Sequence, residues 1–410
     1  MHLNIKLKNL ILYLVFLLII LNEFLSIYIS SFFSYFDDLL NLCIVLLGLL
    51  LVIYKLKNIS SENNNAFFLL IILFIFYIFG ILGNLLSLYQ REKLAIFYDA
   101  ISWFKFFGTL PIFILYFQNK ENDDKDNMIA IIQNCALITV ILAIIFYLIG
   151  CFGILELAVG FDRYGLKALT LGGHPSSSCA ILAWCTAVQF LRESRYKVFR
   201  VLLCSILCLL TLRAKAIGLF VFALYFLFIY KKSSFKIQIV IITLLILIFA
   251  SDQISYYFIS DTNPRAVALK TSLNISKDFF PLGSGFATYG TIYSGRYYSL
   301  AYYVYGLNLK WGFMPEHYEF IGDGGFGTII GQFGVIGCLL ISIYIYKLFK
   351  MTNTVINNNY RKCILLLLLY LLISSTNEIA FSNSSVILFS FVISYLLSLT
   401  NQKYDRKVSD

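Results

Sequence analysis

Long apolar runs follow one another along almost the whole chain, and they limit the folds that it can adopt. Most are about as long as a helix must be to cross the ~30 Å hydrocarbon core of a bilayer. Of the 410 residues 60% are hydrophobic and 13% are charged, whereas about a quarter of a soluble domain is charged. We therefore predict an all-α polytopic membrane protein with about twelve transmembrane helices. The runs are 9–30, 39–54, 66–88, 96–117, 128–150, 174–191, 199–212, 216–230, 235–250, 324–346, 363–377 and 380–399.

One long polar segment interrupts this series between the ninth and tenth runs. Residues 251–322 are too polar to span a membrane and too long for a turn. We predict that they form a large extracytoplasmic loop containing short helices. The predicted organisation is thus a bundle of nine spans at 1–250, the loop at 251–322, and three spans with a cytoplasmic tail at 323–410.

Lysines and arginines gather in alternate connections between the runs. If the N-terminus is cytoplasmic, the inner connections hold most of the 32 lysines and arginines, as the positive-inside rule requires. Both termini are therefore predicted to be cytoplasmic. This inner belt accounts for most of the net charge of +10, so no nucleic-acid partner is implied. The stretch 9–30 lacks a signal-peptide cleavage site and is predicted to be the first span.

Cysteine and histidine spacing gives no sign of a metal centre. The nine cysteines lie in or beside apolar runs without Cys-x-x-Cys spacing, and His2, His174 and His317 are far apart. We expect ordinary thiols, no metal site and no cofactor.

The loop carries a helix-start signal followed by a basic residue. Asn263 is a typical N-cap and Pro264 a typical first helical residue, and apolar residues then recur at helical spacing. We predict an amphipathic helix that ends before Pro281. Arg265 lies in its first turn, where free amides and a guanidinium favour a phosphate. The glycines at 283–285 permit close approach of a ligand. The alternative is that Arg265 only caps a solvated helix and that these glycines only form turns.

Three further cations lie in predicted outer connections. Arg163 precedes a glycine pair in "DRYGLKALTLGGHP", and Arg213 and Lys215 lie in "TLRAKAIG". Snorkelling to the membrane surface would account for each of them singly. Together with Arg265, they are candidates for binding one anionic group there.

The segment 320–337, "FIGDGGFGTIIGQFGVIG", closes the series of outer motifs. Gly327, Gly331 and Gly334 lie at helical spacing and predict close packing of this span on a neighbour. Asp323 lies at the mouth of the span, where a carboxylate can accept a proton or orient a sugar hydroxyl.

The order of these motifs, with "FPLGSGFATYG" and "YYSLAYYVYGLNLKWG" in the long loop, resembles the Wzy-type O-antigen and capsule polymerases of bacteria. The resemblance covers residues 160–337. It implies a metal-independent glycosyltransferase of the bacterial inner membrane that joins undecaprenyl-diphosphate-linked oligosaccharide repeat units at the periplasmic face. Its partners would be that lipid-linked substrate, the bilayer and a chain-length regulator. The resemblance implies that Arg163 and Arg265 are catalytic and that Arg213 and Lys215 bind the substrate. From its position and chemistry we add Asp323 as a third catalytic candidate, with Glu316 the alternative base. The other candidate substrate-binding residues are His174, Tyr298, Glu316 and His317.

Two other functions remain open from the sequence. The related O-antigen ligases place a histidine a little more than ten residues before a glycine of this last motif. Here Asp323 holds that position relative to Gly334, which favours a polymerase. A flippase or transporter of lipid-linked sugars would show internal repeats and ionisable residues within the membrane. Asp99 and Lys105 satisfy the second criterion, unless they form a simple ion pair.

Overall fold

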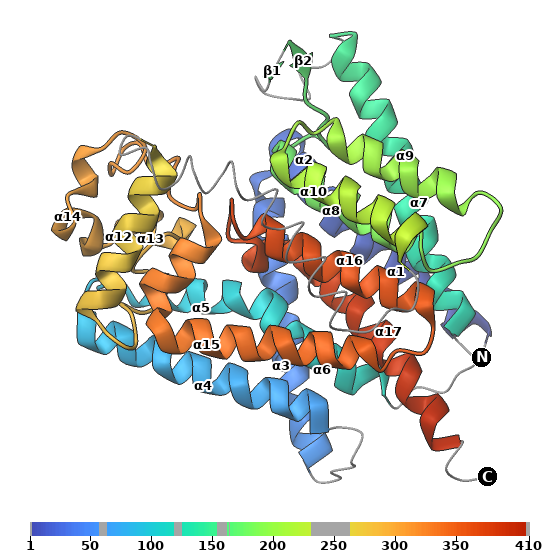
Figure 1. Cartoon of the computed structure of the whole chain (residues 1–410), viewed down its shortest axis with the longest axis horizontal. Coiled ribbons are helices and arrows are strands. Elements are labelled where there is room, and N and C mark those ends of the chain that lie inside the picture. The colour runs from blue at the N-terminus through green and yellow to red at the C-terminus, as the bar shows by residue number, and fades with distance from the viewer. Residues whose placement is uncertain are drawn as a thin grey trace.

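Helices account for most of the protein, as a computed structural model of it shows (Figure 1). The structure describes residues 2–56, 64–118, 125–153, 162–163, 165–230 and 263–406, with the backbone alone for 2–8, 56, 125–126, 162–163 and 400–406. The predicted ninth span, 235–250, and the start of the predicted loop lie outside these residues. The predicted helical class is confirmed.

The elements before the loop are α1 (His2–Ile20), α2 (Asn22–Tyr28), η1 (Ser31–Tyr35), α3 (Phe36–Leu56), α4 (Asn64–Ser87), α5 (Lys93–Phe107), α6 (Thr109–Phe117), α7 (Lys125–Cys151), β1 (Asp162–Arg163), β2 (Leu166–Lys167), α8 (Pro175–Val188), α9 (Lys197–Leu209), α10 (Ala214–Leu224) and η4 (Tyr225–Ile229). The remaining elements are α12 (Pro264–Asp278), α13 (Ile292–Arg296), α14 (Leu300–Val304), η5 (Leu307–Leu309), α15 (Gly325–Asn353), α16 (Asn358–Ser374), η6 (Ala380–Ser382) and α17 (Val386–Arg406). Strands β1 and β2 form an antiparallel hairpin.

The number of helices that can cross a membrane is smaller than the sequence predicts. Among the described residues, four helices are long and apolar enough to span, and six if each of two bent pairs is one span. The bent pairs are α1 with α2, at 66°, and α5 with α6, at 43°. Every predicted run within the described residues overlaps a helix or such a pair. However, α8 and α9 have only 14 and 13 residues. Helices of this length extend about 20 Å, less than the ~30 Å of a hydrocarbon core. A count of twelve spans is therefore not confirmed.

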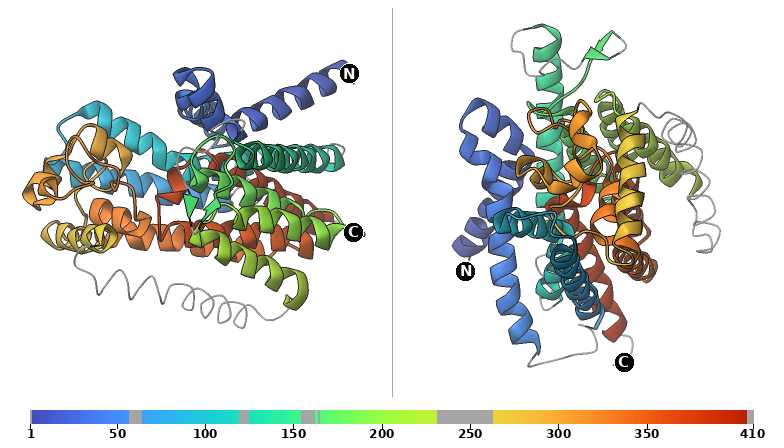
Figure 2. Two further views of the ribbon diagram at one scale, coloured as in Figure 1. Left: turned by 90° about the horizontal axis from the view of Figure 1, so that it is seen from above. Right: turned by 90° about the vertical axis from the view of Figure 1, so that its left-hand side faces the viewer.

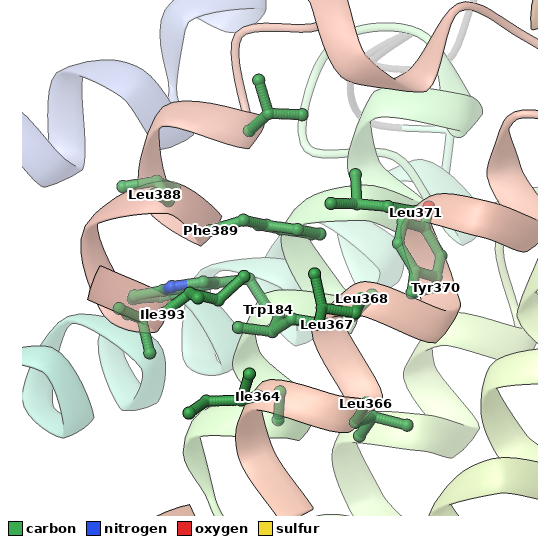
Figure 3. Packing of buried hydrophobic residues seen from close by; sticks show 14 of the residues in the cluster. Trp184, Ile364, Leu366, Leu367, Leu368, Tyr370, Leu371, Leu388, Phe389 and Ile393 are labelled. Carbon is green, nitrogen blue, oxygen red and sulfur yellow. The ribbon is translucent and has the colours of Figure 1, made fainter. Parts of the chain in front are cut away.

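The bundle buries some apolar helices and leaves others open to their surroundings. From Cys363 to Ile373, helix α16 is apolar on every side, and α8, α10, α15 and α17 pack around the helix. Trp184 of α8 and Phe389 of α17 meet Leu367 and Leu368 of α16 in this core (Figure 3). By contrast, α3 and α4 expose large apolar side chains, as expected of surfaces that face lipid.

Residues 263–322 form a lobe at one end of the molecule, opposite the start of α1 and the end of α17 (Figures 1 and 2). Helix α12 begins as predicted, because the Asn263 side chain accepts a hydrogen bond from the Arg265 amide at 3.0 Å and Pro264 is the first helical residue. The helix ends at Asp278, before Pro281. The lobe has a small apolar core of its own, made by Val267, Ile275, Tyr289, Tyr302, Leu307, Phe313 and Ile321.

Residues 281–290, which we call the wedge, are rich in glycine and attach the lobe to the bundle. They lie between α4 and α15. The Ser284 and Gly285 amides donate to the carbonyls of Gly331 and Gln332 at 3.0 and 2.7 Å. Asn84 of α4 exchanges two hydrogen bonds of 2.8 Å with the backbone of Phe286. The predicted close approach of residues 283–285 is therefore an approach to helices of the same chain, rather than to a ligand.

The glycines of α15 have two different roles. Gly331 faces Ser272 of α12 and Tyr289 of the wedge, where an added Cβ would lie 2.8 Å from the Tyr289 ring. Gly327 also faces α12, so the predicted close packing occurs against the lobe. Gly334 has φ +57°, and interrupts the helix where the wedge enters.

Candidate functional site

The buried ion pair of Lys215 and Glu378 joins helix α10 to the connection after α16. Lys215, in the first turn of α10, is 2% exposed. Its Nζ lies 2.5 Å from Oε1 of Glu378, in the connection after α16, and it also donates to Ser374 at 3.2 Å. Burial opposes ionisation of Glu378, but Lys215 and hydrogen bonds from Ser176 and Ser374 hold the pKa of Glu378 below its ordinary value. Lys215 is therefore neutralised within the protein.

His174 and Arg213 stand beside this pair. His174 is the N-cap of α8, and its Nδ1 accepts a hydrogen bond of 3.2 Å from the Ser176 amide. Its Nε2 lies 3.2 Å from the Arg213 guanidinium, which can only donate. Because Nδ1 serves as an acceptor, Nε2 of a neutral ring carries the proton. Two N–H donors then lie 3.2 Å apart, a pair that an anionic oxygen accepting from both would stabilise.

Arg265 and Asp323 meet on the lobe side of the same region. The Arg265 Nε lies 3.4 Å from Oδ2 of Asp323, and its guanidinium donates to Oδ1 of Asn377 at 3.0 Å. Burial raises the pKa of Asp323 above its ordinary value, although Arg265 lowers it; Glu378 and Arg213 also act on it. Since Asn377 and Glu378 are adjacent, one short connection contacts both Arg265 and Lys215.

A polar cavity of about 530 Å³ opens beside these residues. Asn22, Glu23, His174, Ser176, Ser177 and Glu378 line one part of it, and Asp37, Asp38, Asp99, Lys105, Tyr293 and Arg296 line another. Carboxylates, hydroxyls and amides of this kind bind sugar hydroxyls through hydrogen bonds. The volume is within the usual range for a small-molecule site.

Asp99 and Lys105 of α5 line this cavity and do not pair with one another. Lys105 lies 2.6 Å from Asp37 and 2.7 Å from Asp38, both in the first turn of α3. Asp99 instead accepts hydrogen bonds from the Ala287 amide at 2.5 Å and from Gln332 at 3.0 Å. The alternative of an ion pair between Asp99 and Lys105 is therefore wrong, and Asp99 tethers the wedge.

A second, mainly apolar cavity of about 170 Å³ lies between the lobe and the start of α15. Arg265 and Asp323 stand on its wall with Tyr289, Phe313 and Phe320. Ile321 and Gly322 line both cavities. The Arg265–Asp323 pair thus lies where a polar and an apolar space adjoin.

The predicted site residues divide into two groups. The structure brings together His174, Arg213, Lys215, Arg265 and Asp323, which the contacts above connect. Three of the others do not join them in the described parts, and Tyr298 donates to the Phe313 carbonyl at 2.6 Å inside the lobe. The Arg163 backbone lies in β1, and its side chain lies outside the described residues. Glu316 and His317 are exposed and line neither cavity, and His317 lies 3.4 Å from Glu319.

Several contributors escape prediction from the sequence: Glu23, Asp37, Asp38, Asn377 and Glu378. Their partners are distant along the chain, as Glu378 and Lys215 are. A carboxylate within an apolar run is the one signal that marks Glu23. No three histidine, cysteine, aspartate or glutamate side chains in the described segments are arranged to hold a metal ion.

No family model and no curated protein sequence matches this chain.

Proposed function

We propose that this protein is a polysaccharide polymerase that joins lipid-diphosphate-linked oligosaccharide units at the extracytoplasmic face of a bacterial inner membrane. The resemblance of residues 160–337 to the Wzy-type enzymes supports this proposal. The observation that carries it is the convergence of His174, Arg213 and Arg265 from separate segments beside a polar cavity. Such convergence suits a substrate that combines an anionic diphosphate with a polyhydroxylated glycan.

The reaction joins the glycan of one lipid-linked unit to another. A sugar hydroxyl of the acceptor attacks the anomeric carbon of the donor, and the lipid diphosphate leaves. Negative charge grows on that diphosphate in the transition state, so the main catalytic requirement is to stabilise it. Arg213, His174 and Arg265 supply the donors for this purpose, and a guanidinium can bind two phosphate oxygens at once.

Lys215 has a different role from the one the sequence indicates. Lys215 forms an ion pair with Glu378. In this role Lys215 positions the connection that carries Asn377 and does not bind the diphosphate itself. Asp323 similarly orients Arg265. The polar cavity receives the sugar, and the apolar cavity beside Arg265 lies on the lobe side of the diphosphate.

The decisive experiment uses the purified protein in liposomes with a synthetic lipid-diphosphate-linked repeat unit. We expect a ladder of polymer lengths from the wild type. Arg213→Ala and Arg265→Ala should each slow polymer formation by about 10²–10³-fold, the usual cost of losing one charge-stabilising donor. Lys277→Ala, on the exposed face of the same α12 helix, is the matched control and should keep the ladder. Equal activity of Arg265→Ala and Lys277→Ala would contradict the assigned site.

The same assay separates a polymerase from a ligase. A ligase would transfer the donor glycan to a lipid acceptor that carries no diphosphate-linked repeat unit. We expect product only when the acceptor is itself a lipid-diphosphate-linked unit.

A further inference from the structure

Glu23 occupies an unusual place for a carboxylate in an apolar run. The chain bends by 66° between α1 and α2, and Glu23 lies in the first turn of α2, directly after the bend. Its side chain lines the polar cavity. An ionisable group at such a position costs free energy, which indicates a functional role.

Both hydrogen bonds to the Glu23 carboxylate within the described residues fall on one of its two oxygens. Oε2 accepts a hydrogen bond of 2.7 Å from the His174 amide and one of 2.6 Å from the Ser177 hydroxyl. Oε1 has no hydrogen-bond partner among the described residues. The carboxylate is thus fixed in orientation and retains an oxygen that can accept a proton.

A glycine pair makes room for this carboxylate. An added Cβ at Gly173 would lie 2.5 Å from Cβ of Glu23 and would also meet its Oε2. Gly172 has φ +86° and faces Phe24 in the same manner. The glycines before His174 therefore allow α2 to approach α8 closely enough for Glu23 to bind the His174 amide.

The other carboxylates on the cavity wall are already engaged. Asp99 is completely buried and holds the wedge. The remaining three have lysine partners: Asp37 and Asp38 share Lys105, and Glu378 binds Lys215. Glu23 is bound by neutral donors, and a carboxylate without a cation partner is the stronger base.

Glu23 also lies next to the expected leaving group. It binds the backbone of His174, while the ring of the same residue meets Arg213 at 3.2 Å. A donor diphosphate held by His174 and Arg213 would therefore have its sugar close to Glu23.

We propose that Glu23 is the general base of the transfer reaction, an assignment that rests on the proposed function. Its carboxylate removes the proton from the acceptor sugar hydroxyl. That oxygen forms the new bond to the anomeric carbon, and the electron pair of the broken anomeric C–O bond leaves with the lipid diphosphate. Glu23 then releases the proton to water in the cavity. This is a catalytic role distinct from the positioning role of Asp323.

The test compares Glu23→Gln, Glu23→Asp and Glu23→Ala in the liposome assay, with Glu92→Gln, at the exposed N-cap position before α5, as the control. We expect Glu23→Gln and Glu23→Ala to lose 10²-fold or more in turnover while binding the lipid-diphosphate donor with unchanged affinity. Glu23→Asp should retain part of the activity, and Glu92→Gln all of it. Formate should partly restore Glu23→Ala, because it can enter the vacated space and accept the proton, and should not restore Glu23→Gln.

Each other outcome has a separate meaning. Wild-type turnover in Glu23→Gln, or a folded, donor-binding Glu23→Ala that formate does not restore, would overturn the assignment while leaving the proposed function intact. Formate rescue of Asp323→Ala instead would move the base to Asp323. A wild-type protein that makes no polymer would overturn the proposed function and this assignment with it.

Discussion

The Lys215–Glu378 pair is the residue-scale feature on which the site depends most. It joins α10 to the connection after α16, and three neutral side chains complete its hydrogen bonding: Ser176, Ser374 and Asn383. A buried ion pair contributes little net stability, but removing one partner leaves an uncompensated charge. Its main effect is to fix the geometry of the site.

Lys215→Met should lower the free energy of unfolding by about 3–5 kcal/mol, because Glu378 is then left without its cation. The double variant Lys215→Met/Glu378→Gln should regain part of this loss, since glutamine keeps polar atoms for the serines. Thermal unfolding in detergent is the measurement, with Lys277→Met as the surface control. A double variant as unstable as the single one would show that the pair is not energetically coupled.

At this scale the sequence identifies cations more readily than carboxylates. Arg213, Lys215 and Arg265 stand out because they lie beside apolar runs in predicted outer connections, where a cation is costly without an anionic partner. Glu378 lies in a short polar connection where one acidic residue is unremarkable, and its partner is 163 positions away. Pairing at that separation depends on the packing of α10 against α16, which local sequence patterns do not specify.

At the scale of elements, the wedge decides how the lobe is attached. Residues 281–290 are held by Asn84 and Ser87 of α4, Asp99 of α5 and the interrupted backbone of α15. Glycine is required where the backbones approach. Gly283, with φ +76°, would place a Cβ 2.5 Å from the Gly334 amide nitrogen.

Gly283→Ala should therefore prevent correct insertion of the wedge and greatly reduce the amount of folded protein. Gly306→Ala provides the matched control, because Gly306 has a similar φ of +65° but open space around it. Its cost should be about 1 kcal/mol, that of a left-handed backbone for alanine. Size-exclusion profiles and thermal unfolding would measure both. Similar behaviour of the two variants would argue that backbone conformation, and not the close approach, determines the effect.

The start of α12 was predictable and the wedge was not, for physical reasons. An N-cap followed by proline is a local signal, so Asn263 and Pro264 suffice to place the helix. The glycines at 283–285 indicate a close approach of backbone, but the identity of the approaching group depends on α4 and α15, far away in sequence. The bends at α1/α2 and α5/α6 were missed because the apolar runs continue through them.

At the scale of the whole molecule, the lobe and the two described ends of the chain lie at opposite ends of a helical bundle (Figure 2). The distribution of lysine and arginine predicts that the lobe is extracytoplasmic. A reporter fused near residue 290 should therefore be active outside the cytoplasm, and one fused after residue 403 inside it. Reporters for both compartments would be compared at each position. Detection of both fusions on one side would contradict the predicted topology.

The wedge also limits how proteins of this design can be diversified. A lobe attached by two flexible ends could be exchanged between proteins as a cassette. Here residues 281–290 fill a slot shaped by α4, α5 and α15, so an exchanged lobe requires matching changes on those three helices. A chimera that exchanges residues 263–322 alone should therefore fail to fold, whereas one that also carries the matching residues of α4, α5 and α15 should fold.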